Sequence, residues 1–168
     1  MNPLVELAKK SIESYIVNKK RIDPPEKLTE EMMGRAGVFV SLKKKGELRG
    51  CIGTFAPTTE SIAEEVIRNA IESATRDPRF PPVTKEEIPE LEISVDVLTE
   101  PVKVASVKEL DAKRFGIIVK SGMKRGLLLP DLPGVDTPEQ QIAISRRKAG
   151  IHTDESVELY KFEVKRYK

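Results

Sequence analysis

The segment GVFVSLKKKGELRGCIGTF, residues 37–55, predicts a β-hairpin and contains the most unusual stretch of the chain. Two runs of strand-forming residues flank Lys-Lys-Lys-Gly, a composition typical of a turn. The second run carries the only cysteine of the chain, between two glycines and two residues from an arginine. Glycine inside a strand often marks a bulge or a close backbone approach, because it has no side chain to pack. We therefore expect Leu48–Phe55 to form a central strand or its bent end, with Gly50 or Gly53 at a bulge or at an opening that faces a ligand.

Strand alternation decides which side chains this second run presents together. Successive side chains of a strand point to opposite faces of the sheet, so Arg49, Cys51 and Gly53 share one face. On that face a thiol lies near a guanidinium and a patch of bare backbone. Such a surface can receive a ligand, and it makes Arg49, Gly50 and Gly53 candidate ligand-binding residues.

Three helices are expected outside the hairpin. The third helix is expected between residues 137 and 150, because Thr137 with Gln140 is a capping signal for its start and Gly150 is placed to end it. Ser61 with Glu64 is the expected capping box of the second helix, and two preceding threonines are rival caps. Apolar residues at helical spacing place the helices over residues 4–16, over residues 62–74 and between residues 137 and 150.

Alternating or apolar runs predict four further strands. Hairpins and helices follow one another without regular βαβ alternation, which favours an α+β fold with a mainly antiparallel sheet flanked by helices. The predicted strands are Leu91–Leu98, Phe115–Lys120, Gly126–Leu129 and a last strand over Tyr160, Phe162 and Val164.

Composition narrows the classes of function. The chain has 168 residues, the length of one domain, and a net charge of +2, so no domain-wide basic field points to nucleic acid. The basic clusters Lys43–Lys45 and Arg146–Lys148 are short and are expected to be solvated. One cysteine excludes an internal disulfide, and no apolar run approaches the ~20 residues that span a bilayer. We expect a cytoplasmic protein without a membrane partner.

Cys51 is the first candidate for catalytic chemistry. A cationic neighbour such as Arg49 favours the thiolate, which is the nucleophilic form of cysteine. The competing interpretation is structural, because a free cysteine usually behaves as a small buried hydrophobe. His152 is the only histidine, so any Cys–His pair must use it, although a lone histidine is more often a surface residue.

A second group of candidates surrounds a rigid turn, Arg76-Asp77-Pro78-Arg79-Phe80. Its two arginines could hold an anionic ligand through bidentate contacts. Alternatively, Asp77 has a structural role and accepts backbone donors at the end of the second helix. Both interpretations can hold if the turn folds over the predicted strand that contains Cys51. No group of Cys, His, Asp or Glu has a spacing typical of metal ligands, and no cofactor fingerprint is present, so we expect no metal and leave the cofactor open.

The motifs together resemble the AMMECR domain family. The LRGCIG segment, Leu48–Gly53, carries the resemblance with Arg76–Val83, and weaker matches follow at Leu91–Val95, Gly126–Pro130 and Lys148–Gly150. The resemblance covers nearly the whole chain, which implies one AMMECR domain over residues 1–168. It also implies an α+β fold with room for a small second lobe.

Family motifs also suggest a partner for Arg49. An unpaired buried charge is costly, so Arg49 is expected either to pair with a carboxylate, with Asp77 and Glu92 the nearest candidates, or to project into a groove.

Three hypotheses of function follow. The resemblance implies a ligand- or partner-binding module in a system with a Memo-like protein and a radical S-adenosylmethionine protein, with a groove around the LRGCIG segment that takes a small molecule or peptide. The second hypothesis is an enzyme that uses Cys51 as a nucleophile or redox thiol. The third is a nucleic-acid-linked regulator, which the small net charge and the few aromatic residues disfavour.

Overall fold

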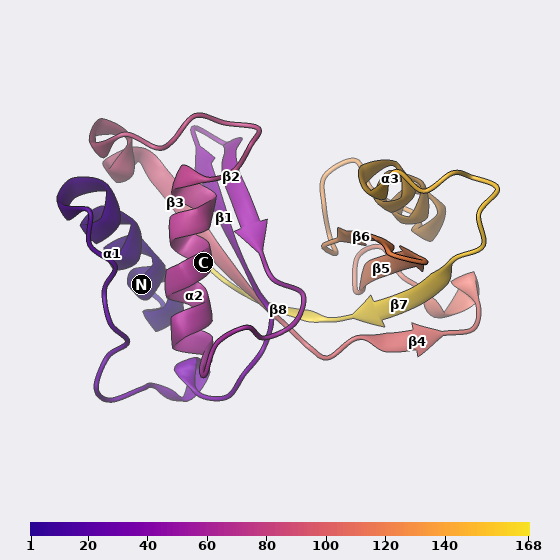
Figure 1. Ribbon diagram of the computed structural model, residues 1–168, viewed down its shortest axis with the longest axis horizontal. Coiled ribbons are helices and arrows are strands. Elements are labelled where there is room, and N and C mark those ends of the chain that lie inside the picture. The colour runs from indigo at the N-terminus through magenta and orange to yellow at the C-terminus, as the bar shows by residue number, and fades with distance from the viewer. The chain divides into compact units, whose positions relative to one another are not determined.

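The computed structural model describes residues 1–168 and divides into two compact units, each with a four-stranded sheet. The first unit comprises Met1–Leu98 with Lys165–Lys168, and the second comprises Thr99–Val164 (Figure 1). Both combine helices with mainly antiparallel sheets, so the predicted α+β class is confirmed. The second unit corresponds to the small lobe for which the prediction left room.

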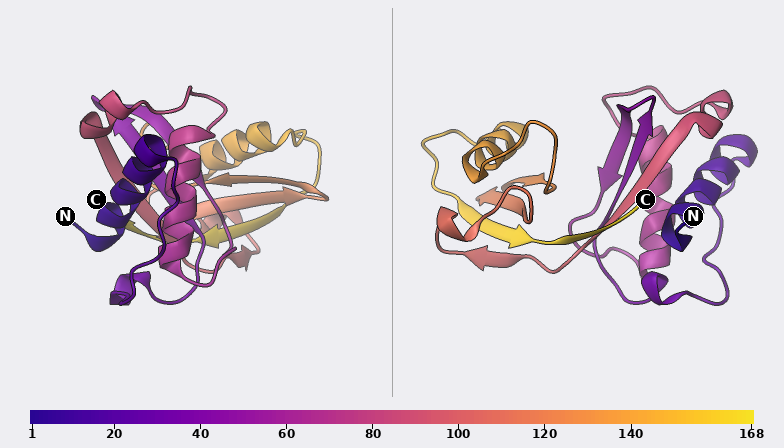
Figure 2. Two further views of the ribbon diagram at one scale, coloured as in Figure 1. Left: turned by 60° about the vertical axis from the view of Figure 1, so that its left-hand side comes forward. Right: turned by 180° about the vertical axis from the view of Figure 1, so that it is seen from behind.

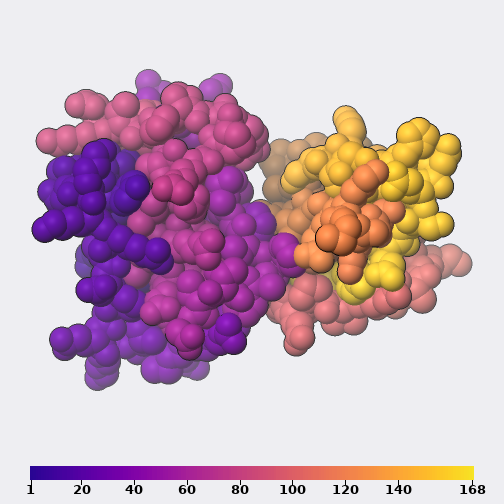
Figure 3. Space-filling model, viewed as in Figure 1, coloured from indigo at the N-terminus to yellow at the C-terminus, as the bar shows by residue number.

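The first unit has a sheet with the strand order β2-β1-β3-β8. Helix α2 packs on β1 and β2, and α1 packs on α2 and β3, so both helices cover the same face of the sheet (Figure 2). In the space-filling view these two helices form much of the face of the unit that is turned to the viewer (Figure 3). The elements are α1 Pro3–Asn18, η1 Glu30–Met32, β1 Val38–Lys44, β2 Glu47–Gly53, α2 Ile62–Thr75, η2 Lys85–Glu90, β3 Leu91–Leu98 and β8 Val164–Tyr167, where η denotes a 3-10 helix.

The core of the first unit lies between the sheet and these helices. Alternate residues of β1 point into it, and Val38, Val40 and Leu42 are fully buried. Leu4 and Ile12 from α1 are fully buried in the same cluster. Burying each such side chain contributes about 1.5–3 kcal/mol, so this cluster is what holds α1 and α2 on the sheet.

Local signals explain where the helices of this unit begin and end. The Asn2 side chain accepts the N–H of Leu4, and Lys19 ends α1 with a left-handed backbone. Ser61 caps α2 by accepting the N–H of Glu64, as predicted. The Glu64 carboxylate instead accepts the N–H of Glu60, so only half of the predicted capping box forms.

The second unit has the strand order β4-β7-β5-β6, and α3 packs on β5 and β6 (Figure 1). The predicted start and end of α3 are confirmed, because Thr137 and Gln140 form a reciprocal capping box and Gly150 adopts a left-handed backbone. The elements are β4 Val102–Val104, η3 Val107–Glu109, β5 Gly116–Ser121, β6 Lys124–Leu128, α3 Pro138–Ala149 and β7 Glu158–Phe162.

The prediction of one continuous last strand is wrong. The chain forms two strands there, because β7 ends at Phe162 in one sheet and β8 starts at Val164 in the other. Side-chain alternation continues through the junction, so the sequence pattern could not reveal the change of sheet. Strand β4 and the 3-10 helices were not predicted, since elements this short show no periodicity. None of the helices combines the length and apolar character needed to cross a bilayer.

Candidate functional site

Strand β2 carries the LRGCIG segment along the edge of the first sheet. The expectation of a central strand is therefore wrong. The register with β1 shifts between Leu42, which faces Gly50, and Lys43, which faces Leu48. Arg49 is the extra residue of this β-bulge, directly before Gly50 and close to one of the predicted bulge positions.

Both glycines of the segment are required by close packing. A Cβ on Gly50 would lie 2.3 Å from the carbonyl oxygen of Ser73 in α2. A Cβ on Gly53 would lie 2.3 Å from the ring of Phe39, the residue opposite it on β1. The glycine backbone is thus covered by a helix carbonyl and by an aromatic ring. It is not the bare surface that strand alternation suggested.

The Ser73 hydroxyl enters the ladder between β1 and β2. Its Oγ accepts the N–H of Ile52 at 2.8 Å and donates to the carbonyl of Val40 at 2.8 Å. Val40 and Ile52 face each other in the register, so the hydroxyl bridges groups that would ordinarily bond directly. This insertion fixes the end of α2 on the LRGCIG segment.

The turn after α2 holds the outer edge of β2 at Cys51. The Asp77 carboxylate accepts the N–H of Cys51 at 3.0 Å, and the Arg79 guanidinium donates to the Cys51 carbonyl at 3.2 Å. Arg79 also pairs with Asp77, with 2.7 Å between Nη2 and Oδ2. These side chains satisfy the main-chain groups that a further strand would otherwise bond. The Arg76–Phe80 turn therefore lies beside the strand that contains Cys51. This is the arrangement in which Asp77 can have a structural role while the arginines remain able to hold a ligand.

The environment of Asp77 stabilises its charged form. The carboxylate has 2% of its side-chain surface exposed. The hydrogen bond from Arg79 is the main cause that lowers the pKa of Asp77 to about 2, and the Cys51 N–H contributes in the same direction. Asp77 is therefore a structural anion at any pH near neutrality.

Arg49 pairs with Glu87, so the expected partners Asp77 and Glu92 are wrong. Its Nε and Nη2 donate to the two carboxylate oxygens of Glu87 at 2.9 and 3.0 Å. Its other donors reach the carbonyls of Pro81 and Pro82 at 2.9 and 3.3 Å. The hydrogen bond from Arg49 lowers the pKa of Glu87 to about 2. The planar fork of Arg49 thus ties β2 to the chain before β3.

Cys51 sits in surroundings that favour the neutral thiol. Burial is the main cause that raises the pKa of Cys51, although Ser41 and Arg79 oppose the shift. The sulfur lies 3.2 Å from the hydroxyl of Ser41, the residue opposite it on β1. His152 lies in the second unit with 70% of its side chain exposed, and its ring accepts the N–H of Asp154. These contacts provide Cys51 with no general base.

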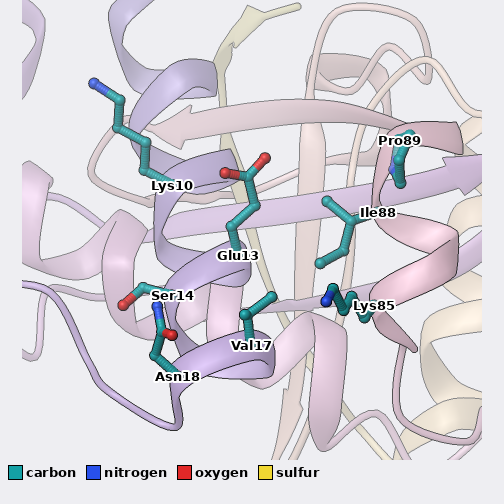
Figure 4. A pocket seen from close by; sticks show the side chains of 8 residues that line it. All are labelled: Lys10, Glu13, Ser14, Val17, Asn18, Lys85, Ile88 and Pro89. Atoms are coloured by element: carbon teal, nitrogen blue, oxygen red, sulfur yellow. The ribbon is translucent and has the colours of Figure 1, made fainter.

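Two cavities of the first unit lie away from Cys51. A groove of about 440 Å³ runs between α1 and η2, with Val17 on one wall and Ile88 on the other (Figure 4). A cavity of about 480 Å³ lies at the start of β3 and includes Lys43 and Ser94. Cys51 lines neither cavity. The structure contains no group of three or more His, Cys, Asp or Glu side chains placed to hold a metal ion.

Sequence reasoning missed several residues that build this region. Ser41, Ser73 and Glu87 carried no motif of their own. Ser73 and Glu87 act through partners far away in the chain, and Ser41 acts through Cys51, 10 residues away on the hairpin. Glu65 is fully buried, and its carboxylate accepts hydrogen bonds from three threonines of the loop between β2 and α2. Burial raises the pKa of Glu65 most, but these bonds outweigh it, so the pKa is lowered overall. An acidic residue on the apolar face of a predicted helix is the signal that could have identified it.

Comparisons with known proteins agree with this geometry. The model of the AMMECR1 family matches residues 5–168. The chain belongs to the AMMECR1 family. A protein of Thermotoga maritima is 49% identical over 99% of this chain and 98% of its own length. The crystal structure of the uncharacterised AMMECR1 relative PH0010 from Pyrococcus horikoshii superposes with a TM-score of 0.87, at 37% identity over 97% of this chain and 88% of that one.

A third AMMECR1 relative, Protein CA_C1420 of Clostridium acetobutylicum, is 50% identical over 99% of this chain. The chain spans only 36% of the length of that protein. The AMMECR1 match covers both the LRGCIG segment and the turn that clamps it.

Proposed function

We propose that this protein is a partner-binding module whose recognition surface is the Arg76–Pro82 turn beside Cys51. The observation that carries the proposal is the clamp of Asp77 and Arg79 on the main chain of Cys51. It fixes an exposed arginine next to an aromatic ring, before any partner arrives. A surface fixed in advance loses little conformational entropy on binding.

The composition of this turn suits an interface. Arg79 has 54% of its side chain exposed, and its guanidinium lies 5.4 Å from the centre of the Phe80 ring. Pro78, Pro81 and Pro82 are exposed and restrict the backbone around Phe80. Arginine and aromatic residues are enriched among the residues that dominate binding energy at protein interfaces.

The candidate ligand residues divide into two groups on this proposal. Arg76 and Arg79 are exposed and can contact a partner; Arg76 makes only a loose ion pair with Glu72 at 3.8 Å. The others, Arg49, Gly50, Gly53 and Asp77, build and hold the surface. The recognition site lies next to the LRGCIG segment as an open surface, in place of the groove expected around it.

A cysteine-dependent enzyme is less well supported. The raised pKa of Cys51 keeps the thiol protonated, and its hydrogen-bond partner Ser41 is not a base. The small net charge likewise offers no support for a nucleic-acid-linked role.

The resemblance to AMMECR domains directs the choice of partners. We propose the Memo-like protein and the radical S-adenosylmethionine protein as the partners to test, with residues 1–168 acting as one AMMECR domain. The two purified partner proteins from the source genome provide the probes, and calorimetric titration of each with the full chain measures affinity.

The test compares Phe80→Ala with Met123→Ala, which truncates a fully exposed apolar side chain of the second unit. We expect Phe80→Ala to weaken binding about tenfold or more, as truncation of a central aromatic residue does. Met123→Ala should bind like the parent chain. Equal affinity of the two variants, or no binding of either partner by the parent chain, would show the proposal to be wrong.

A further inference from the structure

The cavity at the start of β3 opens along an uncovered edge of the first sheet. Strand β8 has four residues and β3 has eight, so β8 cannot cover the whole outer edge of β3. The cavity of about 480 Å³ is lined by the first half of β3, Leu91–Ser94, and by Lys168, the residue after β8. It also includes Val5 and Lys9 of α1, so it lies between a helix and a strand edge.

The register of β3 shows which main-chain groups face this edge. The N–H of Leu98 donates to the carbonyl of Gly37, which makes that pair a hydrogen-bonded one. Hydrogen-bonded pairs recur at every second residue of an antiparallel ladder, so Glu92 and Ser94 direct their main chain toward β1. Leu91 and Ile93 direct theirs outward. The Leu91 N–H donates to Ile88. By this register the Leu91 carbonyl and both main-chain groups of Ile93 point away from β1, at the edge that lines the cavity.

The walls of the cavity differ in chemical character on the two faces of the sheet. Val5 and Ile93 lie on the side covered by helices and are apolar, and Lys9 of α1 belongs to the same side. Lys43, Glu92 and Ser94 lie on the other side, and Lys168 also lines the cavity. Three lysines line the cavity against a single acidic side chain, Glu92, and none of the three makes an ion pair.

We infer that this cavity is a docking site for an acidic peptide segment in extended conformation, which adds to the edge of β3 as a further strand. Addition of a strand supplies main-chain partners for Ile93, and pockets beside the strand select alternate side chains of the peptide. The charge of the cavity selects acidic residues, because its lining has three lysines without an ion pair and one acidic side chain. The site is separate from the Arg76–Pro82 turn and goes beyond the partner-binding function proposed for it.

The two faces of the cavity predict the pattern of the peptide. Side chains of a bound strand alternate between the faces, so one set meets Val5 and Ile93 while the other meets Lys43 and Lys168. A segment with alternating apolar and acidic residues therefore fits best. A capped hexapeptide of the sequence Glu-Val-Asp-Leu-Glu-Val is a suitable probe.

The experiment titrates the full chain with this fluorescein-labelled hexapeptide and follows fluorescence anisotropy. We expect saturable binding that weakens with added salt, because screening acts on exposed charges. Lys43→Glu should weaken binding about tenfold, whereas Lys45→Glu, in the adjacent turn, should not. The same hexapeptide with N-methyl groups on alternate residues keeps its charge but cannot form the ladder, and it should not bind.

Several results would overturn the inference. If the N-methylated hexapeptide bound as tightly as the parent hexapeptide, strand addition would be excluded. If a hexapeptide with lysine in place of each acidic residue bound as tightly, charge selection would be excluded. Amide shifts on binding that spare Leu91–Ser94 would place the peptide elsewhere. A dimer in light scattering that dissociates on Lys43→Glu would assign the edge to a second copy of the chain. Phe80→Ala should leave hexapeptide binding unchanged, so failure here is distinguishable from failure of the proposed function.

Discussion

The Asp77 carboxylate accepts the main-chain N–H of Cys51 at 3.0 Å across 26 residues of sequence. Arg79, bound to the same carboxylate, donates to the carbonyl of Cys51. Two side chains thus occupy both main-chain groups of an edge-strand residue, which closes the edge of β2 at that point to another strand. The motif that contains Asp77 and the segment that contains Cys51 form one structural unit.

Asp77→Asn should destabilise the first unit by about 2–3 kcal/mol, because the buried amide loses the charged pair with Arg79 and one of its acceptor oxygens. Hydrogen exchange of the β1 amides measures the opening of this unit. Asp23→Asn is the matched control, since Asp23 is exposed and should change stability by less than about 0.5 kcal/mol. Similar exchange rates for both variants would contradict a structural role for the clamp.

Arg49→Lys should lower the free energy of unfolding by about 1–2 kcal/mol. Lysine keeps the charge, but it cannot bond both oxygens of Glu87 and the two proline carbonyls at once. Urea unfolding followed by circular dichroism measures the loss. Arg76→Lys is the control at an exposed arginine with 65% of its side chain accessible, where the change should be small. If Arg49→Lys unfolds at the same urea concentration as Arg76→Lys, the fork is not needed for stability.

Gly50→Ala should be among the most damaging single substitutions in the chain, at about 3 kcal/mol or more. The added Cβ would lie 2.3 Å from the main-chain oxygen of Ser73, and backbone cannot move aside without shifting α2. Gly34→Ala provides the comparison, because it meets no atom within 4 Å and carries only the strain of a φ of +79°. That strain is about 1 kcal/mol. A thermal melt that ranks Gly34→Ala as the more harmful would refute the close-packing explanation.

The thiol of Cys51 should react slowly with iodoacetamide at neutral pH. Burial raises its pKa above the ordinary value, so the thiolate fraction falls below that of an unfolded cysteine. Since the chain has one cysteine, mass spectrometry reads its alkylation directly. The alkylation rate of the folded chain should rise with pH, and this rise should occur at higher pH than in the urea-unfolded chain. Equal or faster alkylation of the folded chain at pH 7 would revive the nucleophile hypothesis.

The first unit should lose stability in acid through Asp77 and Glu87. Both have a folded pKa of about 2, below their ordinary values of 3.8 and 4.5. A depressed folded pKa stabilises the folded state at pH above the unfolded pKa, and that stability disappears as the pH falls toward the folded pKa. Each group should contribute on the order of 2 kcal/mol, lost between about pH 4.5 and pH 2.

The acid effect is measured as the urea midpoint at successive pH values. In the double variant Asp77→Asn with Glu87→Gln the decline over this interval should be shallower than in the parent chain. An unchanged slope would mean that other carboxylates control the acid response.

The sequence alone predicted the three helices and most of the strands of this protein, together with the family that it resembles. The hairpin around Lys-Lys-Lys-Gly, the strand Leu91–Leu98 and both ends of α3 depend on contacts within a few residues, so periodicity and capping signals were sufficient. The spacing of Asp77 and Arg79 around a proline also showed that a rigid turn follows the second helix.

Only the tertiary structure decided what the residues of the site do. Arg49 pairs with Glu87 across 38 residues, and Ser73 enters the β1–β2 ladder from a helix across 21. The glycines of the LRGCIG segment looked like an opening, yet each is covered by a group from another element. Alternation in a strand tells which side chains share a face, but not what covers that face. That depends on packing between segments far apart in the chain, which no local pattern encodes.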